Sequence, residues 1–283
     1  MSVLLAILLQ VGAAPTVQPA SPVPDELWEQ RRLNREASRQ REQGESITDN
    51  RLANCVALIE INPEAARSDA SRWFAGAELG QKSDAAQCLG MAEVQLGQWE
   101  AAIAAFTQGR DLTLPGDLKS RAQLGAMAGN AQLAQGQTAA ALSTLEQAQT
   151  DADSAGNEVL KGEIALDRAR TLVALGRSGE AQAALTLART ALPYNAQAWL
   201  LSATLARRLN ALEDAQRFIE EAALLAPADP EIGLEGGVIA VLSGRDDAAR
   251  KSWNSVIETA PESPFAQTAS SYLVQLGAPQ ATQ

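Results

Sequence analysis

AQAWLLSATLARRLNALEDAQRFIEEAALLAPAD occupies residues 196–229, and PEIGLEGGVIAVLSGRDDAARKSWNSVIETAPES follows it at residues 230–263. The two stretches have the same length and the same arrangement of small, large and turn-forming residues. Two sets of residues recur with a spacing of 34: the prolines Pro193, Pro227 and Pro261, and the turn residues Gly176, Asn210 and Gly244. Two independent markers with one period indicate a repeated structural unit of the kind that stacks into arrays.

Five such units fill residues 83–262, with slightly longer turns between the earlier ones. They begin near Ser83, Ala122, Gly162, Ala196 and Pro230. The eighth position is always small, the twentieth is always alanine, and the twenty-fourth is always large. The large residues are Phe106, Leu145, Leu185, Ile219 and Trp253. Small residues let the two helices of a hairpin cross closely, and the large residue fills the space before the next hairpin.

This pattern, with proline at the thirty-second position, resembles the tetratricopeptide-repeat (TPR) family. The resemblance implies an all-α, right-handed superhelical solenoid of antiparallel helical hairpins. The chain departs from the family pattern at the seventh position, where Arg168, Ser202 and Gly236 replace the preferred leucine. Because one hairpin cannot bury its apolar face alone, the stack is expected to fold as a unit.

Both ends of the array have their own signals. Residues 50–82 resemble a degenerate hairpin in which Pro63 opens the second helix and Trp73 takes the large position. Residues 263–277 predict a final helix, with Ser263 as its N-cap and Gly277 after its last turn. The exposed end of a solenoid needs such a capping helix.

Residues 1–13 predict a secretory signal peptide that is cleaved after Ala13, because an apolar run precedes small residues at the −3 and −1 places. This segment has no Lys or Arg, so an uncleaved anchor and a misassigned start stay open as alternatives. Residues 14–24 contain four prolines and are expected to be an extended linker. The expected location is the periplasm or outside the cell, with no stable membrane insertion after cleavage; the alternative is an inner-membrane anchor.

Residues 25–44 predict a charged helix, since Arg32 and Glu36 have the i,i+4 spacing that supports one. Its apolar positions are sparse. It is expected to be an extra N-terminal helix whose Trp28 docks on the array, or a short coiled coil for self-association. The oligomeric state therefore stays open.

The composition excludes several classes of function. The chain has no histidine, two cysteines and a net charge of −11. Histidine-dependent nucleophile systems and four-thiolate metal sites are therefore absent, and the acidity makes nucleic acid an unsuitable partner. No phosphate-binding glycine loop is found. We expect no catalytic residues, no metal and no cofactor, although scattered acids leave carboxylate catalysis formally open.

The first helices of stacked hairpins line a groove in the TPR family, and the resemblance places a set of side chains in it. The set is Gln87, Met91, Asn130, Glu163, Leu166, Arg170, Gln197, Leu200, Thr204, Arg207, Arg208, Leu234 and Val238. This mixture suits an extended or helical peptide, and it also suits an unused solvated surface. Arg170 and Arg207, with Arg208 beside them, could take an acidic side chain, unless Glu163 or solvent satisfies them.

Cys55 and Cys88 are a candidate disulfide, because an exported protein meets an oxidising compartment. Equivalent positions on stacked helices lie about 8–10 Å apart, which is too far for a disulfide unless the first hairpin shifts. The alternative is two buried thiols.

The sequence thus predicts a scaffold or adaptor that binds a protein or peptide in the groove and is exported to the bacterial envelope. One alternative is a subunit of a membrane or polysaccharide-export assembly that is tethered by its N-terminus. A third, an enzyme built on helical repeats, is disfavoured by the missing histidine.

Overall fold

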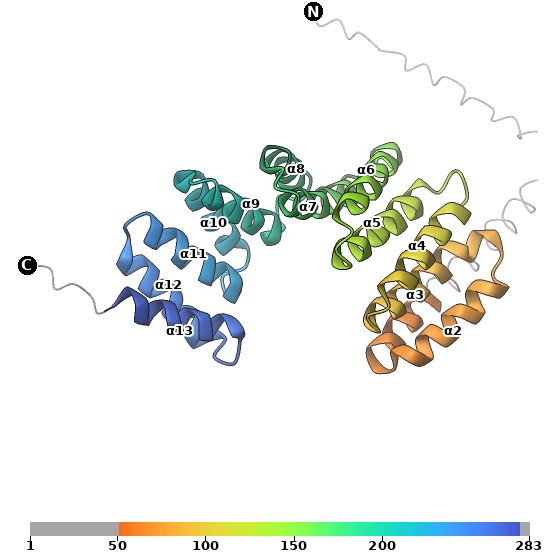
Figure 1. Cartoon of the computed structure of the whole chain (residues 1–283), viewed down its shortest axis with the longest axis horizontal. Coiled ribbons are helices and arrows are strands. Elements are labelled where there is room, and N and C mark those ends of the chain that lie inside the picture. Colours follow the sequence, from red (N-terminus) through yellow and green to blue (C-terminus); the bar gives the residue numbers. More distant parts are fainter. Residues whose placement is uncertain (1–50, 278–283) are drawn as a thin grey trace, which may run out of the picture. The chain divides into compact units, whose positions relative to one another are not determined.

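The computed structural model describes residues 51–277, which belong to the second of two compact units, Asn50–Gln283 (Figure 1). The signal peptide, linker and charged helix predicted for residues 1–44 lie outside the described residues. Residues 51–277 contain helices and turns and no strand. In this part of the chain, no helix is long and apolar enough to cross a membrane.

The helices follow one another with short turns. Residues 51–61 are helical, and η1 (Leu79–Gln81) is a single 3₁₀ turn. The remaining elements are α2 (Pro63–Gly76), α3 (Lys82–Gln95), α4 (Trp99–Leu112), α5 (Leu118–Ala134), α6 (Thr138–Ala155), α7 (Glu158–Ala174), α8 (Ser178–Ala191), α9 (Ala196–Arg208), α10 (Leu212–Leu225), α11 (Pro230–Leu242), α12 (Asp246–Thr259) and α13 (Pro264–Leu276).

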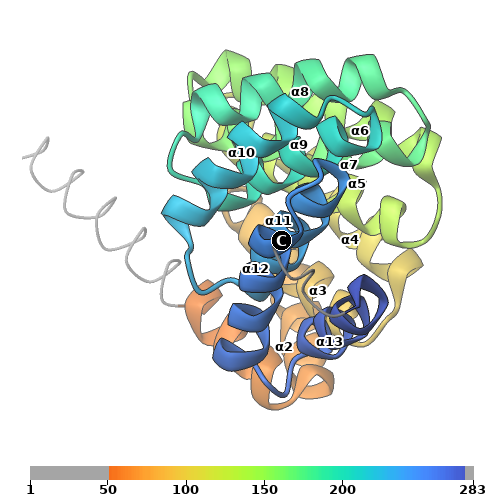
Figure 2. The same cartoon turned by 90° about the vertical axis from the view of Figure 1, so that its left-hand side faces the viewer.

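From α2 to α13, each helix packs against the next one along the chain, so hairpins stack in sequence order (Figures 1 and 2). Four successive pairs of odd-numbered helices also contact one another: α3 with α5, α5 with α7, α9 with α11, and α11 with α13. Successive even-numbered helices have no comparable contact within the described part. The stack is therefore tighter on its odd side, and the predicted all-α solenoid of helical hairpins is confirmed.

Small residues at the eighth position make room for the large residue of the second helix. A Cβ atom added to Gly90 would lie 2.3 Å from the Phe106 ring, and one added to Gly237 would lie 2.1 Å from the Trp253 indole. The alanines at the twentieth position, such as Ala215, are fully buried. The hairpins close by direct approach of backbones, which explains how a chain with few aromatic residues fills its core.

The recurring turn residue ends the first helix of a hairpin in the left-handed conformation. Gly176 has φ 72° and Asn210 has φ 58°. Beyond Gly176, the Arg177 amide donates to the Leu172 carbonyl at 2.9 Å, which satisfies a carbonyl that the helix leaves free. Asparagine serves at the second site because it tolerates this conformation better than most residues.

A disulfide joins the helix at residues 51–61 to α3, the first helix of the next hairpin. Cys55 and Cys88 are bonded, and their Cα atoms lie 6.0 Å apart. This distance is shorter than the spacing expected for stacked helices. The reason lies in the surrounding cluster, where Ala66, Ala85 and Ala92 are buried beside the two cysteines and let the backbones approach.

Candidate functional site

The predicted groove residues all lie on the odd-numbered helices. Gln87 and Met91 are on α3, Asn130 on α5, Glu163, Leu166 and Arg170 on α7, Gln197, Leu200, Thr204, Arg207 and Arg208 on α9, and Leu234 and Val238 on α11. We call the members of this set that are not buried the odd-helix face.

Two members of the predicted set do not belong to this face. Leu166 is 5% exposed and Leu200 is 1% exposed, and each lies in a hydrophobic cluster between neighbouring hairpins. Leu200 shares its cluster with Ile232 and Ile239 of α11. Placing these leucines in an exposed groove was therefore wrong, because they hold one hairpin against the next.

Two of the three predicted arginines have partners within the chain. Arg170 Nη1 lies 2.8 Å from Asp167 Oδ1, and Arg207 Nε lies 2.6 Å from Glu235 Oε1. Neither partner is Glu163, the acid that the sequence suggested. The ion pair of Arg207 links α9 to α11 and is more than three-quarters buried on both sides. Arg207 is consequently a structural residue at this interface.

Sequence reasoning missed both of these acids. Asp167 and Glu235 share the sixth position of their units, one place away from the predicted groove positions. The i,i+3 spacing of Asp167 and Arg170 was a signal that could have found the first pair. No short-range sequence pattern predicts the second pair, because Arg207 and Glu235 are 28 residues apart and meet only where one hairpin stacks on the next.

Asp167 connects α5 with α7. It accepts a hydrogen bond from Asn130 Nδ2 at 2.7 Å and another from Arg170. Burial raises the pKa of its carboxyl above the usual value, and the two hydrogen bonds and the Arg170 charge only partly offset this effect. The carboxylate is therefore less stable here than in water.

Asp167→Asn should raise the melting temperature at pH 7 by about 1–3 °C. The folded protein binds the Asp167 proton more tightly than the unfolded chain does, so the charged carboxylate costs stability above its pKa. In the wild type, protonation of Asp167 removes that cost as the pH falls through the raised pKa. The melting temperatures of the wild type and of Asp167→Asn should then become equal. Thermal melts at pH 7 and at about pH 3.5 measure both effects.

Asp214→Asn is the matched control for this change. Asp214 also pairs with an arginine three residues later, but its side chain is 50% exposed, against 17% for Asp167. An exposed pair of this kind contributes little, so we expect no gain in melting temperature. A lower melting temperature for Asp167→Asn at pH 7 would show that the hydrogen bonds outweigh the burial.

Glu231, at the start of α11, is a second acid whose charge is disfavoured. Burial raises the pKa of its carboxyl, and Asp229 and Glu235 add to the rise, while Arg170 opposes it. Arg170 therefore already has two carboxylates in its surroundings, Asp167 and Glu231.

An apolar pocket of about 190 Å³ opens between α7 and α9, with α8 at its base. We call it the α7–α9 pocket. Its lining residues are Ala169, Arg170, Val173, Leu185, Leu201, Thr204, Leu205 and Arg208. The structure thus brings together three of the predicted groove residues, Arg170, Thr204 and Arg208, and surrounds them with leucines that the groove pattern did not include.

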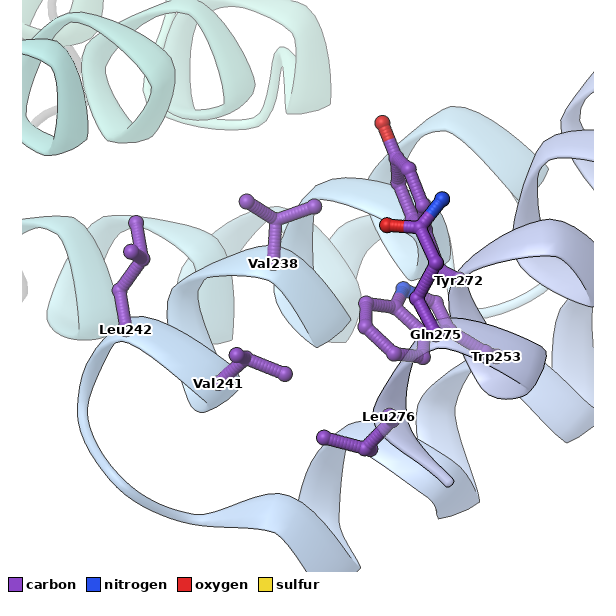
Figure 3. A pocket seen from close by; sticks show the side chains of 7 residues that line it. All are labelled: Val238, Val241, Leu242, Trp253, Tyr272, Gln275 and Leu276. Carbon is purple, nitrogen blue, oxygen red and sulfur yellow. The ribbon is translucent and has the colours of Figure 1, made fainter.

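A second apolar pocket, of about 270 Å³, opens between α11 and α13 (Figure 3). We call it the α11–α13 pocket. Its lining residues are Val238, Val241, Leu242, Trp253, Tyr272, Gln275 and Leu276. Trp253 is fixed by a hydrogen bond from its Nε1 to the Leu234 carbonyl at 3.1 Å, and its ring packs 5.3 Å from that of Tyr272.

The other members of the odd-helix face are spread along the stack. Gln87, Met91 and Asn130 lie on α3 and α5 and line neither pocket. No cluster of side chains that could hold a metal occurs among residues 51–277. This side of the stack therefore has two apolar pockets, and charged side chains line only the α7–α9 pocket.

Comparisons with known proteins show which solved structures share this architecture. No protein-family model and no curated protein sequence matches the chain. Solved structures do match. PilW, a type IV pilus biogenesis factor, is 15% identical, with a TM-score of 0.65 over 78% of this chain and 97% of PilW. YrrB, a TPR protein with an unusual peptide-binding site, is 16% identical, with a TM-score of 0.51 over 71% of this chain and 97% of YrrB.

A TPR protein from Parabacteroides merdae is also 16% identical, with a TM-score of 0.56 over 70% of this chain and 74% of that protein. At such low identity these likenesses inform on the fold alone. They agree with the stack of helical hairpins that the structure shows. The chain therefore has the fold of the tetratricopeptide-repeat proteins.

Proposed function

We propose that this chain is an interaction scaffold, exported to the bacterial envelope, that binds an extended or helical segment of another protein along its odd-helix face. The observation that carries the proposal is the position of the two apolar pockets, both of which open between successive odd-numbered helices. Segments of partner proteins bind such faces by inserting apolar side chains into pockets at intervals.

The surroundings of the pockets suit this role. Buried leucines, an interhelical ion pair and the Trp253 hydrogen bond fix the walls before any partner arrives. A preformed site loses less conformational entropy on binding than a flexible one. No constellation of nucleophile and base is found among the described residues, which favours binding over catalysis.

A selection from a random twelve-residue peptide library, displayed on phage, tests this function with the full chain as bait. Thr204→Trp fills the mouth of the α7–α9 pocket and should weaken the selected peptides at least tenfold. Thr190→Trp is the matched control, because Thr190 is exposed on α8 and lines neither pocket. Fluorescence anisotropy with synthetic copies of the peptides gives the affinities.

Circular dichroism melts must show that both tryptophan variants fold. Equal affinity for the wild type and Thr204→Trp would exclude the α7–α9 pocket as a binding site. A selection that yields no peptide would count against the proposed function as a whole.

Export is supported by the disulfide, since such bonds persist mainly in oxidising compartments. The proposal places the mature N-terminus after Ala13. Mass spectrometry of the protein recovered from the envelope fraction decides this point, and an intact N-terminus would favour the tethered alternative.

A further inference from the structure

The geometry points to the class of segment that the α7–α9 pocket accepts: we propose that it binds an apolar side chain that lies next to a carboxylate, and that Arg208 pairs with that carboxylate. The inference rests on the proposed function and specifies its ligand. Acidic segments with an apolar anchor are thus the partners that this part of the scaffold selects.

The pocket itself selects an apolar group. Ala169, Leu185 and Leu205 form its buried part and are at most 5% exposed. Val173 and Leu201 form partly exposed walls. A polar side chain that packed against these apolar walls would lose its hydrogen bonds to water and gain none from them. An apolar side chain would instead remove its own surface and that of the walls from water.

Arg208 supplies the second half of the specificity. It is exposed at the end of α9, and no hydrogen bond or ion pair joins its guanidinium to another of the residues 51–277. Its two neighbours in space and sequence differ in this respect, because Arg170 is paired with Asp167 and Arg207 with Glu235. Of the three arginines that the sequence grouped together, Arg208 is the one with its charge available.

The position of the incoming carboxylate follows from these pairs. Arg170 already has Asp167 and Glu231 in its surroundings, so another acid there would meet like charges. At Arg208 the acid would meet, at the rim of an apolar pocket, a guanidinium that has no partner among residues 51–277. A bound segment covers such a pair from water, which strengthens the attraction relative to a fully exposed pair.

The chain as a whole is strongly acidic, with a net charge of −11. Long-range electrostatics therefore repel an acidic segment, and its preference for the odd-helix face must come from local contacts. This separates the inference from simple charge attraction, because a cation elsewhere on the surface should have no comparable effect.

The test repeats the library selection on the wild type, on Arg208→Gln and on Lys251→Gln, a control that removes an exposed cation from α12. Peptides selected by the wild type should carry Asp or Glu within two residues of a large apolar residue at least threefold more often than the library. This enrichment should vanish with Arg208→Gln and persist with Lys251→Gln.

A double-mutant cycle then measures the contact directly. Replacing the acidic residue of a selected peptide by its amide should weaken binding to the wild type about fivefold to tenfold, and to Arg208→Gln less than twofold. Serine in place of the apolar anchor should weaken binding to both proteins. Equal amide effects on the two proteins, or no enrichment of acids, would overturn the inference.

The outcomes also separate this inference from the function on which it rests. Peptides that are sensitive to Thr204→Trp but indifferent to Arg208 would leave the scaffold function standing and refute the acidic preference. Peptides indifferent to both changes would exclude the α7–α9 pocket as a binding site and refute the acidic preference. A selection that yields no peptide at all would refute both the inference and the scaffold function.

Discussion

Removing the Cys55–Cys88 disulfide should lower the free energy of unfolding of the N-terminal part of the array by about 3–4 kcal/mol in the chain-entropy model. The bond closes a loop with a sequence separation of 33 residues, so its loss frees the unfolded chain. Cys55→Ala/Cys88→Ala is the variant of choice, because alanines already surround both positions. Urea unfolding followed by circular dichroism measures the change.

The control for this prediction is a reductant. Dithiothreitol should shift the unfolding midpoint of the wild type toward that of the double variant and leave the double variant unchanged. Thiol counting on unfolded, unreduced protein should find no free thiol in the wild type. Two free thiols, or a wild type whose midpoint ignores the reductant, would contradict the prediction and remove the support that the disulfide gives to export.

Gly109→Ala should destabilise the protein by about 1–3 kcal/mol, the usual cost of overpacking. Alanine normally stabilises a helix relative to glycine by about 1 kcal/mol. At Gly109 in α4, however, the new Cβ would lie 2.2 Å from the Cβ of Ala86 in α3. Ala86 is fully buried and has no flexible end that could move aside. The two helices must therefore separate.

Gly179→Ala is the matched control, because Gly179 is exposed in α8 and a Cβ there meets nothing within 4 Å. The same exchange should be neutral or stabilising by up to about 1 kcal/mol at that site. Urea unfolding of the two variants gives opposite shifts if the close approach of α3 and α4 is real. A shift of the same sign for both would show that the hairpin relaxes without cost.

The repeated residues show which parts of the fold could be predicted from the sequence alone. Three signals recur in the sequence: the period of 34 residues, the alanine at the twentieth position of each unit, and the large residue at the twenty-fourth position of each unit. Because the same pattern recurs in every unit, the class of fold, the helical hairpins and their close crossings could be predicted from the sequence. Left-handed turns at Gly176 and Asn210 followed from residue type, because few other residues adopt that conformation.

The candidate site depended on contacts that no local pattern encodes. The groove pattern treated Leu166 and Leu200 as exposed, yet stacking buries both, since the next hairpin covers the side chains that a single helix would leave open. Arg207 and Arg208 are neighbours of the same type, and the sequence could not tell them apart. Only the approach of α11 brings Glu235 to Arg207, whereas Arg208 has no ion pair with any of the residues 51–277.

The sequence by itself thus determined the repeat, the helices and the small residues at their crossings, because these depend on backbone conformation and on spacing within one unit. The tertiary structure decided which side chains lie at the surface, which charges are paired, where the two apolar pockets open and how closely Cys55 approaches Cys88. These features depend on how one hairpin lies on the next. Residues far apart in the chain meet only there. Arg207 and Arg208 are adjacent, yet Arg207 forms a largely buried ion pair and Arg208 has none with residues 51–277.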